Sequence, residues 1–197
     1  MRKLNLSIIL LLLALNLQAQ YKLELGGSFG ATNGYLVPLG NYVSQDKNII
    51  IPSYSYQFTV GNSYSFKNNI LNIDLSYIVK KNNKEFDNQK ATYKYDYIIL
   101  PIYYGIQKNK FTLNFGFTNN FSLKVKNVPS DFFIKKYNIS LLLGSDYKIN
   151  NRLSIKTDIL HDITPYDNSY YYTSTKNTNG YFYMYNIMIG LKYAIIN

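Results

Sequence analysis

The sequence predicts an all-β protein, an eight-stranded antiparallel up-and-down transmembrane β-barrel. Three observations predict this fold: the chain begins with an export signal, eight segments alternate between apolar and polar residues, and short and long links between the segments strictly alternate. An alternation with a period of two gives a strand one apolar face and one polar face. The wall of a barrel between lipid and a polar lumen requires such strands.

Residues 1–19 have the organisation of a signal peptide. Arg2 and Lys3 give a basic start, an apolar run follows from Ile8 to Leu15, and Ala19 is a small residue before a cut near Gln20. The run is shorter than the roughly 20 residues that cross a bilayer as a helix. We therefore predict a signal peptide at 1–19 and one barrel domain at 20–197. The absence of cysteine excludes a disulfide framework and a lipid-anchored cysteine.

The predicted strands carry bulky apolar residues on one parity and mainly Gly, Ser, Thr and Asn on the other. They cover residues 21–30, 54–66, 71–80, 92–106, 111–125, 137–147, 153–159 and 183–195. Small residues suit the narrow interior of an eight-stranded barrel, and bulky ones suit lipid. In the most regular segment, 111–125, we expect Phe115 and Phe117 to face acyl chains and Lys124 to point inward near the outer rim.

The fourth segment is less regular. Proline cannot donate a ladder hydrogen bond, so Pro101 should mark a bulge or an unpaired position. The apolar residues lie on odd positions from Tyr93 to Tyr97 and on even positions from Ile98 to Ile106. An extra residue near Tyr97 would switch the faces. The alternative is an irregular edge of the membrane span.

The links differ in length in a regular way. The short ones are 67–69, 107–110 and 150–152, and the long ones are 32–53, 82–91, 127–135 and 164–182. An up-and-down barrel places all short turns and both chain ends on the periplasmic side, with the long loops outside. The first long loop contains Tyr35 to Leu39 and Ile49 to Ile51, which could form an extra hairpin and give ten strands.

Two short motifs resemble a known family, and a third resembles a biogenesis signal. The stretch Tyr97-Ile98-Ile99-Leu100-Pro101-Ile102-Tyr103-Tyr104 resembles Tyr-Leu-Glu-Ile-Pro-Leu-Leu-Leu in the small outer-membrane β-barrel proteins of Bacteroidetes, the PorT-like family, with Ile99 in place of Glu. Ile159 to Ile163 resembles the family's Gly-Leu-x-Asn-Ile stretch. The terminal Gly190 to Ile195 is similar to the signal read by the barrel-assembly machinery. The resemblance implies a role accessory to secretion.

Charges of both signs lie on the inward parity of the predicted strands. They are Lys22, Glu24, Asp74, Lys80, Lys124, Asp146, Lys148, Lys156, Asp158 and Lys192. Isolated buried charges are costly, so these groups should pair. Pairing favours a plugged lumen over an open pore.

The sequence favours a non-enzymatic protein with a structural, surface-binding or secretion-accessory role. No catalytic, cofactor-binding or metal-binding residues are predicted, and no cofactor is expected. The alternatives are an enzyme with a rim site around His161, using Asp162 or Ser169, and a secreted lipocalin-like ligand carrier whose apolar face turns inward.

The predicted location is the cell outer membrane, and the predicted partners follow from it. The net charge is +10, or +8 once Arg2 and Lys3 leave with the signal peptide. An exported chain is not expected to bind nucleic acid, and Lys-rich loops at 82–94 and 124–136 can neutralise lipopolysaccharide. We expect a monomer that contacts outer-membrane lipid and, during biogenesis, the barrel-assembly machinery. A further envelope protein partner is left open.

Overall fold

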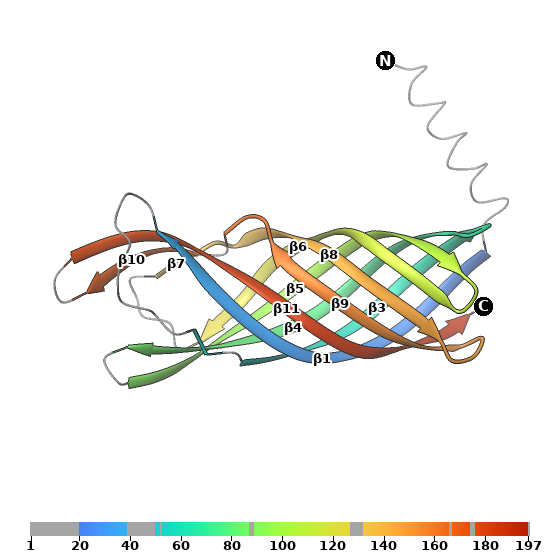
Figure 1. The fold of residues 1–197 in the computed structure, drawn as a ribbon, viewed down its shortest axis with the longest axis horizontal. Coiled ribbons are helices and arrows are strands. Elements are labelled where there is room, and N and C mark those ends of the chain that lie inside the picture. The colour runs from blue at the N-terminus through green and yellow to red at the C-terminus, as the bar shows by residue number, and fades with distance from the viewer. Residues whose placement is uncertain are drawn as a thin grey trace, which may run out of the picture.

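Eight long strands close into an antiparallel barrel in the computed structural model (Figure 1). The structure describes residues 20–38, 50–51, 53–86, 89–126, 132–165, 167–173 and 176–196. The barrel strands are β1 (Gln20–Pro38), β3 (Ser53–Phe66), β4 (Asn69–Phe86), β5 (Gln89–Lys108), β6 (Phe111–Lys126), β8 (Tyr137–Lys148), β9 (Leu153–Asp162) and β11 (Lys176–Ile196). The predicted fold class is confirmed. The predicted signal peptide lies outside the described residues.

The barrel closes through pairing of its first and last strands. The order is β1-β3-β4-β5-β6-β8-β9-β11, and β1 pairs with β11 from Leu23 opposite Ile196 to Pro38 opposite Gly180. Each barrel strand therefore pairs with its neighbours in the chain and the up-and-down topology is confirmed. Closure removes the open edges through which strands of another chain could pair.

Three short strands extend the sheet: β2 (Ile50–Ile51), β7 (Phe132–Ile134) and β10 (Asp167–Thr173). β2 pairs with β4, and β10 pairs with β11 and β7. The ten-strand alternative is wrong for the described residues. Ile50 and Ile51 add a short bridge beside Lys84 and Asn83 instead of forming two more barrel strands.

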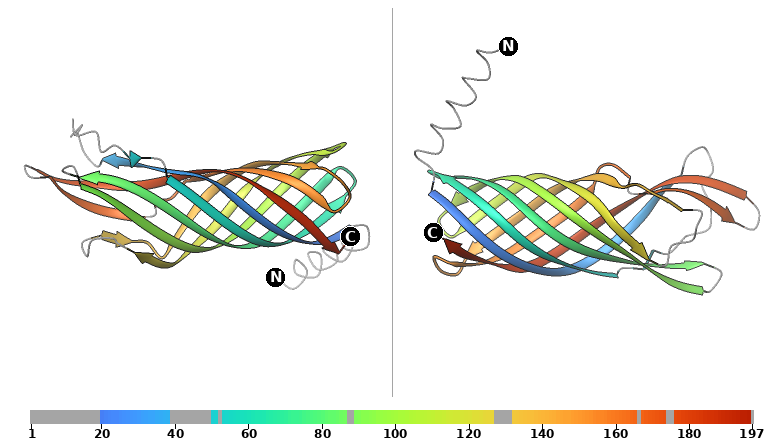
Figure 2. Two further views of the ribbon diagram at one scale, coloured as in Figure 1. Left: turned by 90° about the horizontal axis from the view of Figure 1, so that it is seen from below. Right: turned by 180° about the vertical axis from the view of Figure 1, so that it is seen from behind.

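The two ends of the barrel differ. Tight turns follow β3, β5 and β8, and the first two contain Lys67 and Asn109 at positive φ, 55° and 56°. At the other end the strands continue far beyond the barrel (Figures 1 and 2). Most of the predicted loop at 82–91 is a hairpin of β4 and β5, and the one at 164–182 contains the hairpin of β10 and β11. β11 has 21 residues, whereas roughly 9 to 11 residues cross a membrane.

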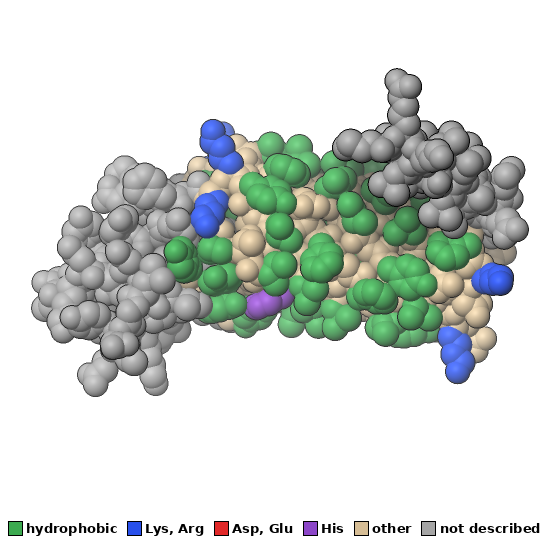
Figure 3. Space-filling model, turned by 90° about the horizontal axis from the view of Figure 1, so that it is seen from above, with side chains coloured by type: hydrophobic (Ala, Val, Ile, Leu, Met, Phe, Trp, Pro, Cys, Tyr) green, Lys and Arg blue, Asp and Glu red, His purple; other side chains and the backbone are tan. Residues whose placement is uncertain are grey.

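Exposed apolar side chains on all eight barrel strands form a belt around the barrel, and Figure 3 shows one face of it. Thirty-two large hydrophobic side chains are exposed among the described residues, including Phe115 at 47% and Phe117 at 53%. The outward direction predicted for both phenylalanines is confirmed. On the face shown in Figure 3, Lys and Arg side chains lie at the two ends of the belt. No helix among the described residues is long and apolar enough to cross a membrane.

The inward direction predicted for Lys124 is wrong because β6 contains a bulge. Asp96 of β5 lies opposite Lys124, but the next residue, Tyr97, lies opposite Ser122, so Leu123 is an extra residue in β6. An extra residue reverses the faces beyond it. Val125 therefore packs against the barrel interior, and Lys124 is exposed on the outer wall.

The irregularity expected near Tyr97 is present, but β5 itself keeps one parity. Tyr93, Tyr95 and Tyr97 are buried on the same inner face as Ile99 and Tyr103, since the extra residue belongs to β6. The shift of the apolar residues of β5 from odd to even positions therefore has another cause. At the level of Tyr93 to Tyr97 the inner face of the barrel is itself apolar.

Pro101 marks the expected unpaired position. The β4–β5 register is the same on both sides of it, with Ile73 opposite Ile102 and Ser76 opposite Ile99, but the ladder is interrupted between these pairs. On its other side Pro101 lies opposite Thr118 of β6. The missing N–H thus breaks the ladder toward β4 alone.

Candidate functional site

Buried charges form a cluster in the periplasmic half of the lumen. The ammonium of Lys192 lies 2.6 Å from a Glu24 carboxylate oxygen and 3.8 Å from Asp146. These three side chains come from β11, β1 and β8, on both sides of the barrel closure. The cluster therefore ties together strands that are far apart in the sequence.

Lys156 forms the second centre of this cluster. Its ammonium lies 2.9 Å from Asp158 and 3.9 Å from Asp74. The Tyr103 hydroxyl donates a hydrogen bond of 2.9 Å to Asp74, and the centre of its ring lies 5.3 Å from the Lys156 ammonium and 5.9 Å from that of Lys192. Tyr103 thus connects the two lysine centres across the lumen.

Neutral side chains complete the cluster. Ser63 hydrogen-bonds with Glu24 and Asn72, at 2.8 Å and 2.7 Å, and Asn114 donates a bond of 2.9 Å to Asp146. Below them the periplasmic mouth is a recess of about 30 Å³, lined in part by Lys22, Lys148 and Arg152. The inward charges predicted from the sequence lie here or in the cluster above, except Lys80, which lies farther out, and Lys124. Pairing is confirmed for the charges of the cluster, Glu24, Asp74, Asp146, Lys156, Asp158 and Lys192. The Lys148 ammonium instead donates a hydrogen bond to Gln107.

An apolar layer lies above the cluster. It contains Ile99, Leu142, Leu160, Met184 and Met188, which are at most 2% exposed, together with inward tyrosines of β5. The alternation in the sequence does not reveal this layer, because its members stand beside outward apolar residues and interrupt the period of two. Leu142 lies between Leu141 and Leu143, and such unbroken apolar runs were the available signal.

A second polar group lies on the extracellular side of the apolar layer. Asp162 accepts hydrogen bonds from the Ser140 hydroxyl at 2.6 Å and from the Met184 backbone N–H at 3.0 Å. The Lys80 ammonium is 3.8 Å from Asp162 and 5.2 Å from the centre of the Tyr97 ring. Both oxygens of the Asp162 carboxylate therefore accept hydrogen bonds that hold β9 to its neighbouring strands.

The alternative rim site is not assembled by the described residues. His161 points outward and its ring stacks on that of Tyr35, with centroids 5.9 Å apart, whereas the neighbouring Asp162 points into the lumen. The Nε2 atom of His161 is 3.3 Å from the Tyr35 hydroxyl, and Tyr35 also stacks on Tyr183. The side chain of Ser169 lies outside the described part of the chain. Among the described residues there is also no group of acidic, His or Cys side chains arranged to hold a metal ion.

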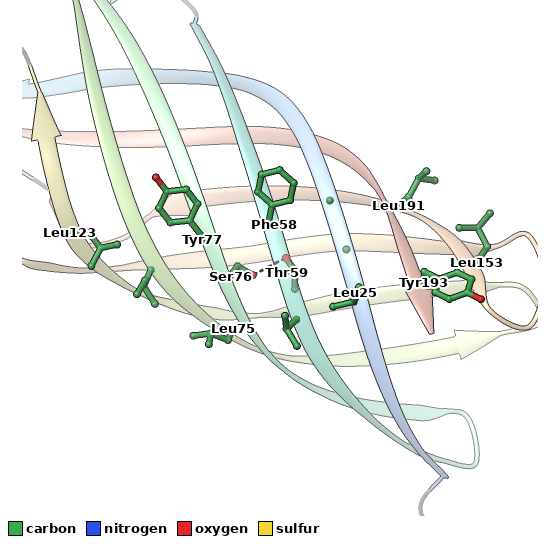
Figure 4. A pocket seen from close by; sticks show the side chains of 14 residues that line it. Leu25, Phe58, Thr59, Leu75, Ser76, Tyr77, Leu123, Leu153, Leu191 and Tyr193 are labelled. Carbon is green, nitrogen blue, oxygen red and sulfur yellow. Dashed lines mark hydrogen bonds between the residues drawn. The ribbon is translucent and has the colours of Figure 1, made fainter. Parts of the chain in front are cut away.

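A hollow in the described surface lies outside the barrel (Figure 4). It has a volume of about 790 Å³, and its lining includes Leu25, Phe58, Leu75 and Leu191 from four strands. These side chains belong to the exposed apolar belt. A lipocalin-like carrier would have its apolar cavity inside the barrel. The apolar face is outside, so the alternative of a secreted lipocalin-like carrier is wrong.

The fold is similar to two solved outer-membrane barrels. Neisserial surface protein A matches with a TM-score of 0.53 and 12% identity, over 87% of this chain and 96% of that one. The outer membrane protein OprG from Pseudomonas aeruginosa matches with a TM-score of 0.54 and 14% identity, over 91% of this chain and 98% of that one. The fold is that of an outer-membrane β-barrel. Neither a protein-family model nor a curated protein matches the sequence.

The distribution of apolar and charged side chains agrees with this fold. Exposed apolar side chains surround the barrel, and charged side chains within the belt's level point into the lumen and are paired. Water would be a poor solvent for such a belt, and lipid covers it at no cost in hydrogen bonds. The chain is an outer-membrane β-barrel protein.

Proposed function

We propose that this barrel is a non-conducting, non-enzymatic protein of the cell surface, whose extracellular hairpins bind a partner. One observation carries the proposal: the lumen is filled by paired charges and an apolar layer, while β4, β5, β10 and β11 continue well beyond the apolar belt. A narrow barrel whose interior is filled by side chains provides no aqueous channel. The membrane-spanning part of the barrel does not require long hairpins outside the membrane.

The arrangement of polar groups supports the non-enzymatic part of the proposal. His161 is directed outward and engaged with Tyr35, and Asp162 is directed inward and engaged with Ser140. A general base must lie within hydrogen-bond reach of its partner group. The candidate pair named from the sequence therefore has the wrong geometry for joint acid–base chemistry.

A role accessory to secretion is the finer form of this proposal, and it depends on the PorT-like resemblance of residues 97–104. The structure adds one physical point to that resemblance. Pro101, the residue shared with the family stretch, interrupts the ladder beside Asp74, a member of the luminal cluster. We propose membership of a PorT-like family on these residues, with a monomeric barrel as the working unit.

Two measurements test the proposal. The refolded barrel in planar bilayers should give no stable ohmic conductance; a steady channel would overturn the non-conducting assignment. For partner binding, residues 170–179 can be replaced by an Asn-Gly turn that joins Ser169 and Gly180, which lie opposite each other. This variant should fold, with unchanged heat-modifiable gel mobility, but lose its crosslinked partner on intact cells. Unchanged crosslinking would remove that hairpin from the proposal.

A further inference from the structure

Three lysines lie in one row across β4, β5 and β6. Lys81 is directly opposite Lys94, and Lys94 is directly opposite Lys126. We refer to Lys81, Lys94 and Lys126 as the lysine row. Side chains directly opposite in an antiparallel ladder have Cβ atoms about 5 Å apart, and like charges there destabilise the sheet. A negative charge close to the lysine row would therefore stabilise the sheet.

The lysine row faces outward. Lys94 lies on the opposite parity from the buried Tyr93 and Tyr95 of β5, and the bulge at Leu123 turns Lys126 to the same outer side. Lys81 donates a hydrogen bond to the Tyr54 hydroxyl, and its ammonium lies 4.2 Å from the centre of that outward-facing ring. The three ammonium groups are thus placed on the outer wall of the barrel and not in the lumen.

The row lies just above the extracellular edge of the apolar belt. Tyr77 and Ile98 form a pair of exposed residues in that belt, and Lys81 is four residues farther along β4 than Tyr77. Four residues span about 13 Å along a strand and about 10 Å along the membrane normal at a tilt near 40°. Lys124 stands between the row and the belt, opposite Asp96. The lysine row and Lys124 therefore lie at the level of the lipid headgroups in the outer leaflet.

The carboxylates that the structure describes do not balance this charge. Among the side chains that the structure describes, Asp96 is the acidic group beside the row, 3.4 Å from Lys94. Desolvation lowers the pKa of Lys94, but the hydrogen bond and the charge of Asp96, together with Tyr56 and Tyr77, raise it above its usual value, so the ammonium stays charged. With Lys124 included, four ammonium groups face one carboxylate. Among the described side chains at this level, the outer wall of β4–β6 therefore has a net charge of +3.

We propose that the lysine row, with Lys124, binds the phosphate groups of lipopolysaccharide in the outer leaflet. The acyl chains of the same lipid then cover the apolar residues below, such as Ile98 and Phe121. Phosphate oxygens accept hydrogen bonds from several ammonium groups at once and relieve the repulsion between opposite lysines. The inference rests on the position of the barrel in the outer membrane. It is independent of the partner proposed for the hairpins.

Native mass spectrometry of the refolded full barrel with added lipid A tests the proposal. Bisphosphorylated lipid A should form a defined 1:1 adduct, dephosphorylated lipid A should bind more weakly, and inorganic phosphate should not compete. The triple variant Lys81→Gln, Lys94→Gln and Lys126→Gln should lose about tenfold or more in affinity, since each lysine contributes modestly to anionic-lipid binding. Equal binding of both forms of lipid A by the unaltered barrel would overturn the proposal without any variant.

The matched control removes three positive charges at the opposite end of the barrel. Lys108, Lys110 and Arg152 are exposed near the periplasmic turns, and their change to Gln should leave lipid A binding unaltered. An equal loss in both triple variants would show that net charge alone governs binding and would contradict a site. A triple Lys→Arg variant of the row should keep the affinity. Its loss would likewise refute recognition of phosphate by these cations. Hairpin crosslinking should be normal in every one of these variants.

Discussion

Removal of the Lys156 ammonium should destabilise the barrel strongly. Lys156→Met keeps an unbranched side chain that lacks the terminal ammonium, and it leaves the Asp158 and Asp74 carboxylates, 2% and 0% exposed, without their nearest cation. Breaking a buried ion pair by deleting one partner costs about 3–5 kcal/mol. We expect a loss of that size in the free energy of unfolding. Lys108→Met, at an exposed position, should change it by less than about 0.5 kcal/mol.

The assay follows from the composition. The chain has no tryptophan, so the folded fraction in a urea series is best measured by heat-modifiable gel mobility of barrels in lipid vesicles. The double variant Lys156→Met with Asp158→Asn separates pairing from packing. If the two side chains interact as the 2.9 Å contact indicates, the second change should recover about 1–3 kcal/mol. Strictly additive losses would refute the ion-pair reasoning.

Two further changes test the faces and the packing of the wall. Phe115→Arg places a charge in the lipid-facing belt and should lower the free energy of unfolding by about 2–4 kcal/mol near the bilayer midplane. Thr118→Ser keeps the hydroxyl that bonds to Asn120, so it should change this free energy little. Equal tolerance of both changes would contradict the assigned faces. Gly116→Ala adds a Cβ that would collide with the Ile102 carbonyl and with Tyr103, so a loss of about 1–3 kcal/mol in the same urea series is expected. An unchanged midpoint would show that the strands do not approach this closely.

The outer face of the barrel could be predicted from the sequence because it depends on one strand at a time. Phe115 and Phe117 alternate with small or polar residues, and alternation alone determines the side on which they lie. The turns at Lys67 and Asn109 could be predicted for a similar reason, since each link is a short polar stretch between two regular segments.

The parts that the sequence did not reveal depend on pairs of strands. The alternation of β6 continues through Val125, and only its register with β5 makes Leu123 an extra residue. The apolar layer was missed because Leu142 and Met188 lie next to apolar outward residues. The contact of Glu24 with Lys192 joins the first and last barrel strands, and nothing local in either strand specifies its partner.

The compensation of positive charge separates the two kinds of lysine in this barrel. Lys156 and Lys192 are buried, and each lies within 4 Å of two carboxylates, so the protein itself supplies their counter-charge. Among the described side chains, Lys124 and Lys126 have no carboxylate within that distance, although they stand where a sheet would normally avoid placing several cations together. A lysine that is paired with carboxylates of the protein stabilises the fold. A lysine without such a carboxylate is available to bind an external anion. Because the uncompensated group lies at headgroup level, the bilayer that covers the belt is also the nearest source of that anion.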